Sequence, residues 1–534
     1  MVALVVSTAL ASCADGGVRT ESATRRDTAT TVTSTSTAAS EPTPPTTGGD
    51  IAPPATTSPS STAPSTTEQP TTAPPTPEPS PDSTMSSAPG TDDPVSTSAG
   101  DSLYPELGSA DLDVVSYHVR LSYDPATTEL EGTVTLDVAV ARRLDELAID
   151  ASGLTIEAVD VDGEPASSFR TEGNELFIEP ATSVGPSTPD DPSVVAITYR
   201  DDVGPSRSTA ELPIGWFTTD GGSYVLNEPD GARTWLPSND HPSDKASWLF
   251  EITVPRGTTA VANGTLVDQR TGPDGTRWVW RQDEPMPTYL LQVLTGDYKV
   301  LEAGRAAGVP ITNVALARDV ERMQPYFDLT DDQIEFFEPL FGPYPLDGYG
   351  LAFTDSFPGL AMETQGRSLF SREDFGGEVG YIQQLLLSHE LAHQWFGNAV
   401  SPARWQDLWL NESFASYAQW LWFEEIGFDT VASLAASNLQ GRQLPTEPTA
   451  QPTAATLFGY ERYDGGAVVL HALRRQLGDD AFFRLLRRWV ADNDGTSRTT
   501  DDFVALAEEV GETDLDRFRA DWIDAAALPS KFPS

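Results

Sequence analysis

Short runs of alternating apolar and polar residues recur through residues 105–310. In "SYHVRLSY" every second residue is apolar and falls on one face of an extended chain: Tyr117, Val119, Leu121 and Tyr123. Similar runs follow in "GTVTLDVAVA", "VVAITYR", "WLFEITVP" and "TRWVWRQ". Because successive side chains of a strand point to opposite faces, this period of two indicates half-buried strands. Many short strands at regular spacing predict an antiparallel β-sandwich over residues 105–310.

The period of the pattern lengthens in the C-terminal part of the chain. Apolar residues three or four positions apart in "RDVERMQPYFDLTDDQIEFFEPLFG" and "GGAVVLHALRRQLGDDAFFRLLRRWVADN" predict helices. A strand-like stretch, "GYGLAFTDSFPGLAMETQGRSLFS", lies between them. "TTDDFVALAEEVG" begins with a threonine cap and an acidic first turn and ends at Gly511. We therefore expect a mostly α domain over residues 311–534, and a fold class that is multidomain α and β.

Residues 14–104 carry a different composition. Ser, Thr, Pro, Ala and Gly dominate, as in "TTSPSSTAPSTTEQPTTAPPTPEPSPD", and large apolar residues are almost absent. Such a segment cannot bury enough surface to offset the entropy lost on ordering. We expect a disordered stalk that holds no chemistry.

The first thirteen residues, "MVALVVSTALASC", form a short apolar segment that ends in small residues and Cys13. The pattern is typical of a bacterial export signal with a lipobox, although a basic first region is missing, and it is too short to span a bilayer. We expect Cys13 to be lipidated and to anchor the protein at the extracellular face of the bacterial membrane. Secretion without an anchor is the alternative.

The charge of the chain limits its partners. The formal net charge is −47, and only three lysines are present: Lys245, Lys299 and Lys531. So acidic a chain argues against binding to nucleic acid and against electrostatic docking on anionic lipid.

The stretch "LLLSHELAHQWFG", residues 385–397, places two of the five histidines in an apolar run. His389 and His393 are four residues apart, so on a helix their imidazoles share one face, with Glu390 beside them. Two imidazoles can bind Zn²⁺, and the glutamate can take a proton from water. Two core histidines would need polar partners, which the flanking leucines and aromatic residues do not offer. We therefore favour a zinc site.

A catalytic zinc needs a third protein ligand and an open position for water. Cys13 is the only cysteine, so a cysteine-based site is excluded and the ligand should be His, Asp or Glu. The stretch "WQDLWLNESFASYAQWLWFEEIG" predicts an amphipathic helix with Glu412 among its apolar residues. An unpaired carboxylate is unfavourable there, whereas a metal ligand is not. Eighteen residues separate Glu412 from His393, which suits a second helix packed on the first.

The pattern "HELAH", eighteen residues, then "NES" is similar to that of the gluzincin metallopeptidases, and the neighbouring residues resemble the aminopeptidase N family. The family has a WLNEGFA-like stretch at this point, and Ser413 stands here in the place of its glycine. The resemblance covers most of residues 110–534. It implies a β-sandwich followed by a thermolysin-like catalytic domain with one Zn²⁺ per chain. The implied ligands and general base are His389, His393, Glu412 and Glu390.

The resemblance also implies residues that bind the substrate. The family's GAMEN strand binds the substrate backbone, and its glutamate binds the free α-amino group. In "GLAMETQG", Ala361, Met362 and Glu363 match this strand, whereas Leu360 and Thr364 do not.

Two more residues follow from the same resemblance. In the family, a second carboxylate near the amine comes from a loop that corresponds to "NEPDGARTWLPSNDHP", which gives Glu228. The tyrosine of a YEKGA-like stretch stabilises the oxyanion, and "YDGGA" offers Tyr463, with Asp464 and Gly465 as departures. Tyr460 is nearby but lacks the following GGA.

These residues predict a zinc-dependent aminopeptidase that hydrolyses the N-terminal residue from peptides with a free N-terminus. An epoxide hydrolase-like enzyme on the same scaffold would keep the same residues and stays open as an alternative. A non-catalytic peptide-binding surface protein would be expected to lose a ligand, the base or the tyrosine, and none is lost. Glu363 and Glu228 together disfavour an endopeptidase. We expect a monomer that meets the membrane only through its lipid anchor.

Overall fold

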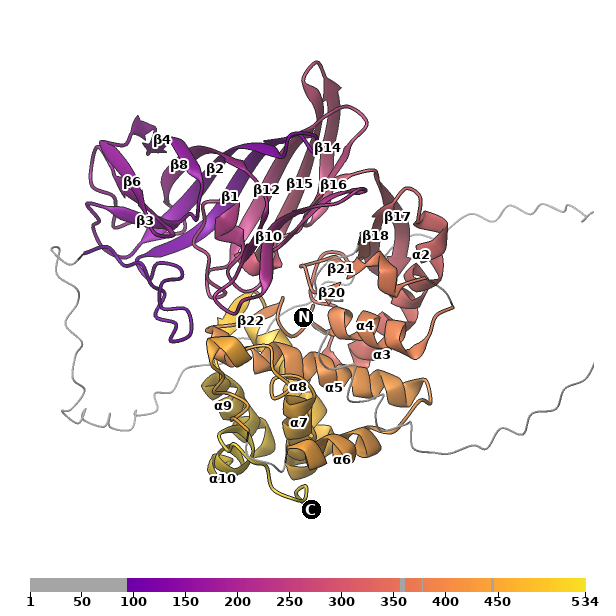
Figure 1. Cartoon of the computed structure of the whole chain (residues 1–534). Coiled ribbons are helices and arrows are strands. Elements are labelled where there is room, and N and C mark those ends of the chain that lie inside the picture. The colour runs from indigo at the N-terminus through magenta and orange to yellow at the C-terminus, as the bar shows by residue number, and fades with distance from the viewer. Residues whose placement is uncertain (1–93, 356–360, 377, 443–445) are drawn as a thin grey trace, which may run out of the picture. The chain divides into compact units, whose positions relative to one another are not determined.

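The computed structural model describes residues 94–355, 361–376, 378–442 and 446–534 (Figure 1). The predicted export signal with Cys13 and nearly all of the predicted stalk lie outside the described residues.

The largest sheet contains eight strands in the order β14–β15–β12–β1–β2–β8–β4–β5. In β1 the alternation is confirmed, because the four residues predicted to share one face are all buried. Strands β1 and β12 run parallel, whereas the other neighbours in the sheet are antiparallel. The predicted antiparallel sandwich therefore departs from that pattern at this pair, which parallel geometry permits because a long connection separates the two strands. The strands are β1 (Leu112–Tyr123), β2 (Glu129–Val140), β4 (Thr155–Val161), β5 (Glu164–Pro165), β8 (Ser193–Asp202), β12 (Ala246–Val254), β14 (Thr265–Gly272) and β15 (Gly275–Met286).

Two smaller sheets share a hydrophobic core with the large one. Val119 of the large sheet, Trp216 of the second and Ile149 of the third belong to this single core. Such layers give each sheet one buried face. The second sheet, in the order β13–β16–β11–β10–β9, consists of β9 (Pro205–Arg207), β10 (Pro213–Thr218), β11 (Gly222–Leu226), β13 (Thr259–Ala262) and β16 (Val293–Gly296). The third, in the order β3–β7–β6, consists of β3 (Leu147–Asp150), β6 (Ser168–Glu172) and β7 (Glu175–Glu179).

A further five-stranded sheet, β17–β18–β19–β21–β20, opens the C-terminal part. Among the described strands, β20 lies at the edge of this sheet and pairs only with β21. The domain boundary predicted at residues 310/311 falls inside β18, and Met362 of β20 belongs to the core of the β-rich part, so the two parts are continuous. The strands are β17 (Tyr298–Ala306), β18 (Val309–Leu316), β19 (Leu351–Thr354), β20 (Ala361–Met362) and β21 (Ser368–Ser371), with a separate pair formed by β22 (Val400–Pro402) and β23 (Thr496–Arg498).

Helices make up most of the remaining C-terminal part (Figure 1). Helix α9 begins as predicted, because the hydroxyl of Thr499 accepts a hydrogen bond from the backbone N–H of Asp502, and it ends at Gly511. The helices are α2 (Val320–Phe327), α3 (Leu329–Phe341), α4 (Tyr381–Ala392), α5 (Trp409–Glu425), α6 (Val431–Gly441), α7 (Asp464–Leu477), α8 (Asp479–Asn493), α9 (Thr500–Gly511) and α10 (Asp516–Phe518).

Helix α5 differs from its prediction. It was expected to be amphipathic, but every residue from Trp409 to Phe423 is buried. The helix lies between α4, α6 and α7, so no side of it faces solvent until its last turn. Its polar residues Ser413, Ser416 and Gln419 are therefore buried together with Glu412.

The residues that precede β1 pack against both parts of the fold. We call residues 94–111 the strap. Asp101 accepts a hydrogen bond from the backbone N–H of Trp405 at 2.6 Å, and the N–H of Ser109 donates to Asn239 at 2.6 Å. Tyr104 is buried. The folded part therefore starts before residue 105.

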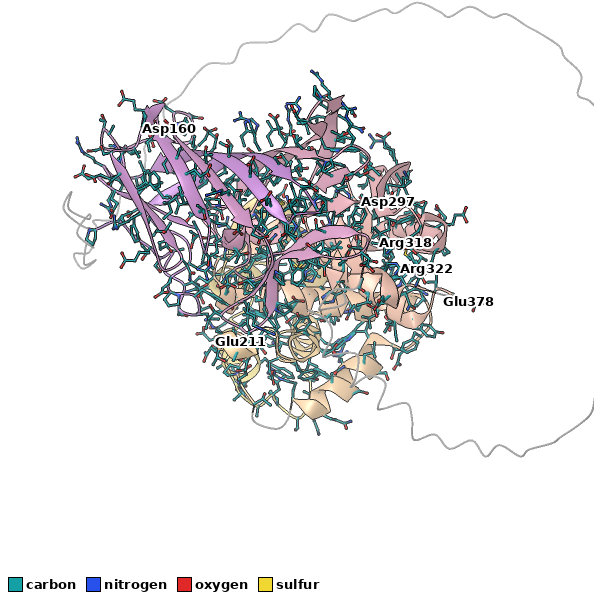
Figure 2. The ribbon with its side chains drawn as sticks, turned by 45° about the horizontal axis from the view of Figure 1, so that its top comes forward. Asp160, Glu211, Asp297, Arg318, Arg322 and Glu378 are labelled. Carbon is teal, nitrogen blue, oxygen red and sulfur yellow. The ribbon has the colours of Figure 1, made fainter. Side chains whose placement is uncertain are left out.

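Acidic residues are exposed at more than one place on the surface. In the view of Figure 2, Glu211 lies apart from Asp297 and Glu378, and the basic Arg318 and Arg322 lie between those two. Among the helices that the structure describes, none has the length and apolarity needed to cross a bilayer.

Candidate active site

The two histidines of the HELAH motif lie at the C-terminal end of α4. His389 is in its last turn and His393 caps it, and their rings meet edge to face with centroids 4.7 Å apart. Both side chains are about 1% exposed. The helix thus brings the imidazoles together as their spacing predicts.

Glu412, in the first turn of α5, completes this group. Its Oε2 atom lies 3.2 Å from Nε2 of His389 and 3.5 Å from Nε2 of His393. Two ligands held about 2.1 Å from one tetrahedral ion are about 3.4 Å apart. The three atoms are therefore spaced as ligands of one Zn²⁺, and the donor set of two nitrogens and one carboxylate oxygen fits that ion.

Hydrogen bonding prepares the imidazole of His393 for a metal. Nδ1 of His393 lies 3.1 Å from the backbone carbonyl of Phe396, an arrangement in which Nδ1–H donates and Nε2 keeps its lone pair. Burial lowers the pKa of His389 to about 4, which keeps its imidazole neutral. Burial opposes the ionisation of Glu412, but the two histidines outweigh it and hold the pKa of Glu412 well below its usual value.

Glu390 is buried beside the metal ligands. Its carboxylate, that of Glu363 and a ring nitrogen of His393 lie within 4.8 Å of one another. Its Oε2 atom has no hydrogen-bond partner among the described residues. Burial raises the pKa of Glu390 to about 8. Such a carboxylate can accept a proton.

Glu363 and Glu228 form an acidic wall next to Glu412. One carboxylate oxygen from each of the three lies within 4.8 Å of the others. Burial raises the pKa of Glu228, and the neighbouring charge of Glu363 adds to the rise. One oxygen of Glu228 and one of Glu363 lack a partner in the described part of the chain. Burial of two carboxylates with unpartnered oxygens is unfavourable unless a cationic group pairs with them.

The backbone ahead of Glu363 forms the edge strand β20. Ala361 and Met362 pair with Phe370 and Leu369 of β21, and their other side pairs with no described strand. The residues predicted to bind the substrate backbone thus lie on a strand edge that is unpaired among the described residues.

Sequence reasoning missed the residues that hold Glu363. The side-chain amide of Asn398 donates to its carbonyl oxygen at 2.7 Å, and that of Gln394 approaches the same oxygen at 3.4 Å. Both are fully buried. Two amides four residues apart in the apolar run after His393 are the signal that could have revealed them.

Tyr463 belongs to the site and Tyr460 does not. The ring of Tyr463 stacks at 6.1 Å on that of His389, and its hydroxyl is buried without a partner among the described residues. Tyr460 instead donates to the backbone carbonyl of Asn438 on α6 at 3.1 Å. The choice between the two tyrosines, which rested on the following GGA, agrees with this placement.

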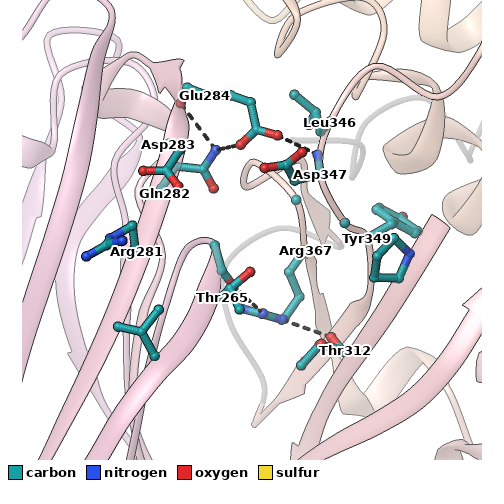
Figure 3. A pocket seen from close by; sticks show the side chains of 15 residues that line it. Thr265, Arg281, Gln282, Asp283, Glu284, Thr312, Leu346, Asp347, Tyr349 and Arg367 are labelled. Carbon is teal, nitrogen blue, oxygen red and sulfur yellow. Dashed lines mark hydrogen bonds between the residues drawn. The ribbon is translucent and has the colours of Figure 1, made fainter.

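A cavity of about 390 Å³ lies between strands of the β-rich part and segments of the C-terminal part (Figure 3). Residues of β14 and β15 line one side, and Asp347, Tyr349 and Arg367 line the other. None of the predicted site residues is among the described residues that line it. The cavity is therefore separate from the acidic, zinc-binding group.

Two family descriptions match the chain. Residues 114–290 match the Peptidase M1 N-terminal domain, and residues 326–522 match the Peptidase family M1 domain. The first range covers most of the β-rich part, and the second contains the zinc ligands.

Curated relatives include Probable aminopeptidase 2 of Sulfurisphaera tokodaii, 26% identical over 73% of this chain and 51% of that protein. Tricorn protease-interacting factor F2 of Thermoplasma acidophilum is 25% identical over 78% of this chain and 54% of its own length. The chain spans about half the length of the curated relatives that it matches.

Solved structures match this chain over a larger share of both lengths than these curated relatives do. An M1 zinc metallopeptidase from Deinococcus radiodurans, in a variant bound to a Tyr-Ser-Ala substrate, has a TM-score of 0.72 and 29% identity. The match covers 82% of this chain and 99% of that one. The fold, the family matches and the arrangement of zinc donors agree: the chain belongs to peptidase family M1, and its cofactor is zinc.

Proposed function

We propose that the protein is an aminopeptidase that removes the N-terminal residue from peptides. The observation that carries this proposal is the acidic wall of Glu228 and Glu363, buried and unpartnered beside the zinc ligand Glu412. A free ammonium group placed there would neutralise charge that is otherwise unfavourable to bury. A substrate held by its α-amino group presents its first peptide bond to the catalytic group.

His389, His393 and Glu412 would hold the zinc ion. When bound, Zn²⁺ supplies Lewis-acid activation of a water molecule and of the scissile carbonyl group. Glu390 accepts the proton of the attacking water on its free oxygen and later gives it to the leaving amine. The hydroxyl of Tyr463, which has no competing partner in the described part of the chain, donates to the developing oxyanion.

The open edge of β20 is proposed to align the substrate. An extended peptide can add to an exposed strand edge through main-chain hydrogen bonds. Ala361 and Met362 would supply these bonds, and Glu363 follows directly to meet the ammonium group. The distance from the edge of β20 to the acidic wall is fixed. It would therefore select peptides by their free N-terminus rather than by their internal sequence.

The test uses the full chain, purified without chelator, against fluorogenic amides of different amino acids. Each amide is supplied with a free and with an acetylated amine. We expect chelator-sensitive cleavage of the free-amine forms alone, restored by added Zn²⁺. Equal cleavage of both forms would overturn the role of the acidic wall. Bound zinc with no cleavage of any amide would point to an epoxide hydrolase-like or non-catalytic protein.

We also propose that Cys13 carries a lipid that anchors the protein at the extracellular face of the bacterial membrane. Support comes only from the apolar segment and lipobox-like residues that precede it. Expression in a bacterial host with a labelled fatty acid should give a labelled membrane fraction, and Cys13→Ser should abolish the label. A soluble, unlabelled wild-type protein would favour plain secretion.

The remaining proposal is that the protein acts as a monomer. The acidic surface, with a formal charge of −47, disfavours self-association. Light scattering coupled to size-exclusion chromatography should give the mass of one chain, and a dimer mass would contradict the proposal.

A further inference from the structure

Helix α5 holds the chain on both sides of Tyr463. The hydroxyl of Ser413 donates to the backbone carbonyl of Arg462, the preceding residue, at 2.6 Å. The indole N–H of Trp420 donates to the carboxylate of Asp464, the following residue, at 3.1 Å. Both donors and Asp464 are buried, so water does not compete effectively for these bonds.

The packing between α5 and the start of α7 leaves almost no space for side chains larger than that of glycine. A Cβ atom on Gly466 would lie 1.8 Å from Oγ of Ser413, so α7 approaches α5 as closely as a glycine allows. On Gly465, a Cβ atom would lie 2.8 Å from the carbonyl oxygen of Tyr460. Glycines at both positions are therefore required by the contact between the Tyr463 turn and its surroundings.

The phenol of Tyr463 depends on this backbone for its position. Its hydroxyl makes no hydrogen bond to the described residues. Tyr463 stands just before α7 in a non-helical conformation, with φ −95° and ψ −114°. A side chain without its own polar partner is placed by its backbone and by packing, here on the ring of His389.

We propose that Ser413 and Trp420 are positioning residues that hold the Tyr463 hydroxyl where the oxyanion develops. The inference rests on the proposed function. It gives α5 two tasks, since the residue before Ser413 is the zinc ligand Glu412. One rigid helix thus sets the distance between the metal and the oxyanion donor.

The proposal also explains departures from the family pattern. Ser413 stands where the family has glycine, and Asp464 and Gly465 stand where it has glutamate and lysine. Of these departures, Ser413 donates one bond of this contact and Asp464 accepts the other from Trp420. Gly465 leaves the space that Arg442 fills, whose Cδ atom would lie 3.1 Å from an added Cβ.

The test compares full-length Ser413→Ala and Trp420→Phe with Ser416→Ala, a buried serine on the same helix. Each of the first two should lower kcat about three- to tenfold, the effect of one lost hydrogen bond, with KM within about twofold of wild type. In a Tyr463→Phe background neither should lower kcat further, because the group they position is gone. Ser416→Ala should leave kcat unchanged.

Two outcomes overturn the proposal: unchanged kcat in both variants, or an equal loss of kcat in the Tyr463→Phe background. Hydrogen exchange supplies a readout that needs no activity. Amides of residues 459–466 should exchange faster in Ser413→Ala than in Ser416→Ala, and equal rates would refute the contact's positioning role. If wild type cleaves no free-amine substrate, the proposed function fails, while the exchange experiment still decides whether Ser413 holds the turn.

Discussion

At the scale of single residues, the active site is a group of buried carboxylates that need positive charge. Glu228, Glu363, Glu390 and Glu412 are all at most 8% exposed. Their neighbours His389 and His393 cannot neutralise them while acting as neutral metal ligands. A Zn²⁺ ion and a substrate ammonium group would supply the missing charge, which explains why so many polar atoms here lack a partner among the described residues.

Glu390→Gln separates proton transfer from metal binding. The amide keeps the size of the side chain but cannot accept a proton, so kcat should fall about a hundredfold or more. Zinc content, measured by atomic absorption, should stay at one ion per chain because Glu390 is not among the three ligands. Full activity with zinc retained would contradict the role of Glu390 as base.

Glu363→Gln should weaken recognition of the free amine. Loss of one charge-assisted contact to the ammonium group should raise KM about tenfold or more for free-amine amides. The melting temperature should not fall, because the substitution removes a buried like charge beside Glu228 and Glu412. Glu373→Gln, at an exposed glutamate ten residues further along the chain, is the control. An unchanged KM in Glu363→Gln would show that the ammonium group binds elsewhere.

At the scale of secondary-structure elements, close packing and buried charge restrict which residues α5 and the small strands can contain. Helix α5 is buried along nearly its whole length and contacts the metal-binding α4 and the Tyr463 turn.

In the β-rich part, Glu175 of β7 lies directly opposite Asp150 of β3. Like charges in this position destabilise a sheet unless one is neutral.

Gly466→Ala tests the close approach of α5 and α7. Alanine normally stabilises a helix relative to glycine by about 1 kcal/mol. Here the new methyl group would clash with Ser413, so stability should fall by about 1–3 kcal/mol. Ser413→Gly in the same chain removes the clashing hydroxyl and should restore most of the loss in calorimetry. A stabilised single variant would mean that the helices are further apart than described.

Glu175→Gln tests the carboxyl pair by its pH dependence. Burial raises the pKa of Glu175 to about 8, and Asp150 adds to the rise. Its usual pKa is about 4.3. A raised pKa means that the folded state holds the proton of Glu175 more tightly than the unfolded state does. The contribution of this group to the free energy of unfolding is therefore fully present below about pH 4 and is lost as pH rises through about 8. A glutamine at this position has no carboxyl proton to lose, so its contribution to stability does not change with pH.

The melting temperature of Glu175→Gln should therefore rise relative to that of wild type as the pH increases from 5 to 9. Glu179→Gln, exposed on the same strand, serves as control and should show a constant difference. A difference for Glu175→Gln that is independent of pH would show that this carboxyl group is ionised in the folded protein throughout the range.

At the scale of the whole molecule, the strap of residues 94–111 joins the two parts of the fold. It contacts Asn239 in the β-rich part and the backbone of Trp405 in the helical part. Because Glu228 comes from the first part and Glu363 from the second, the acidic wall depends on how these parts are held together.

Asp101→Ala tests the strap in the full chain. The change leaves the buried backbone N–H of Trp405 without its acceptor and removes the carboxylate 3.5 Å from His241. Stability should fall by about 1–3 kcal/mol, the penalty for an unsatisfied buried donor. Ser102→Ala, an exposed neighbour, should have little effect. Equal melting temperatures for the two variants would show that the Asp101 contacts add nothing to the stability of the fold.

The sequence by itself determined features that depend on short-range periodicity. Alternation predicted the strands, the i, i+4 spacing brought His389 and His393 onto one face, and an acidic residue in an apolar helix pointed to Glu412. These inferences hold because a strand repeats every two residues and a helix every 3.6, whatever surrounds them. Resemblance to a known family added Glu228, Glu363 and Tyr463, which no local pattern connects.

Only the tertiary structure decided which distant groups meet. The parallel pairing of β1 with β12, the full burial of α5 and the strap all arise from contacts between segments far apart in the chain. Local pattern cannot show that Ser413 bonds Arg462 or that Asn398 holds Glu363, because each polar group finds its partner only after packing has excluded water. The sequence thus indicated which residues carry the chemistry, and the packing of the two parts set the distances between them.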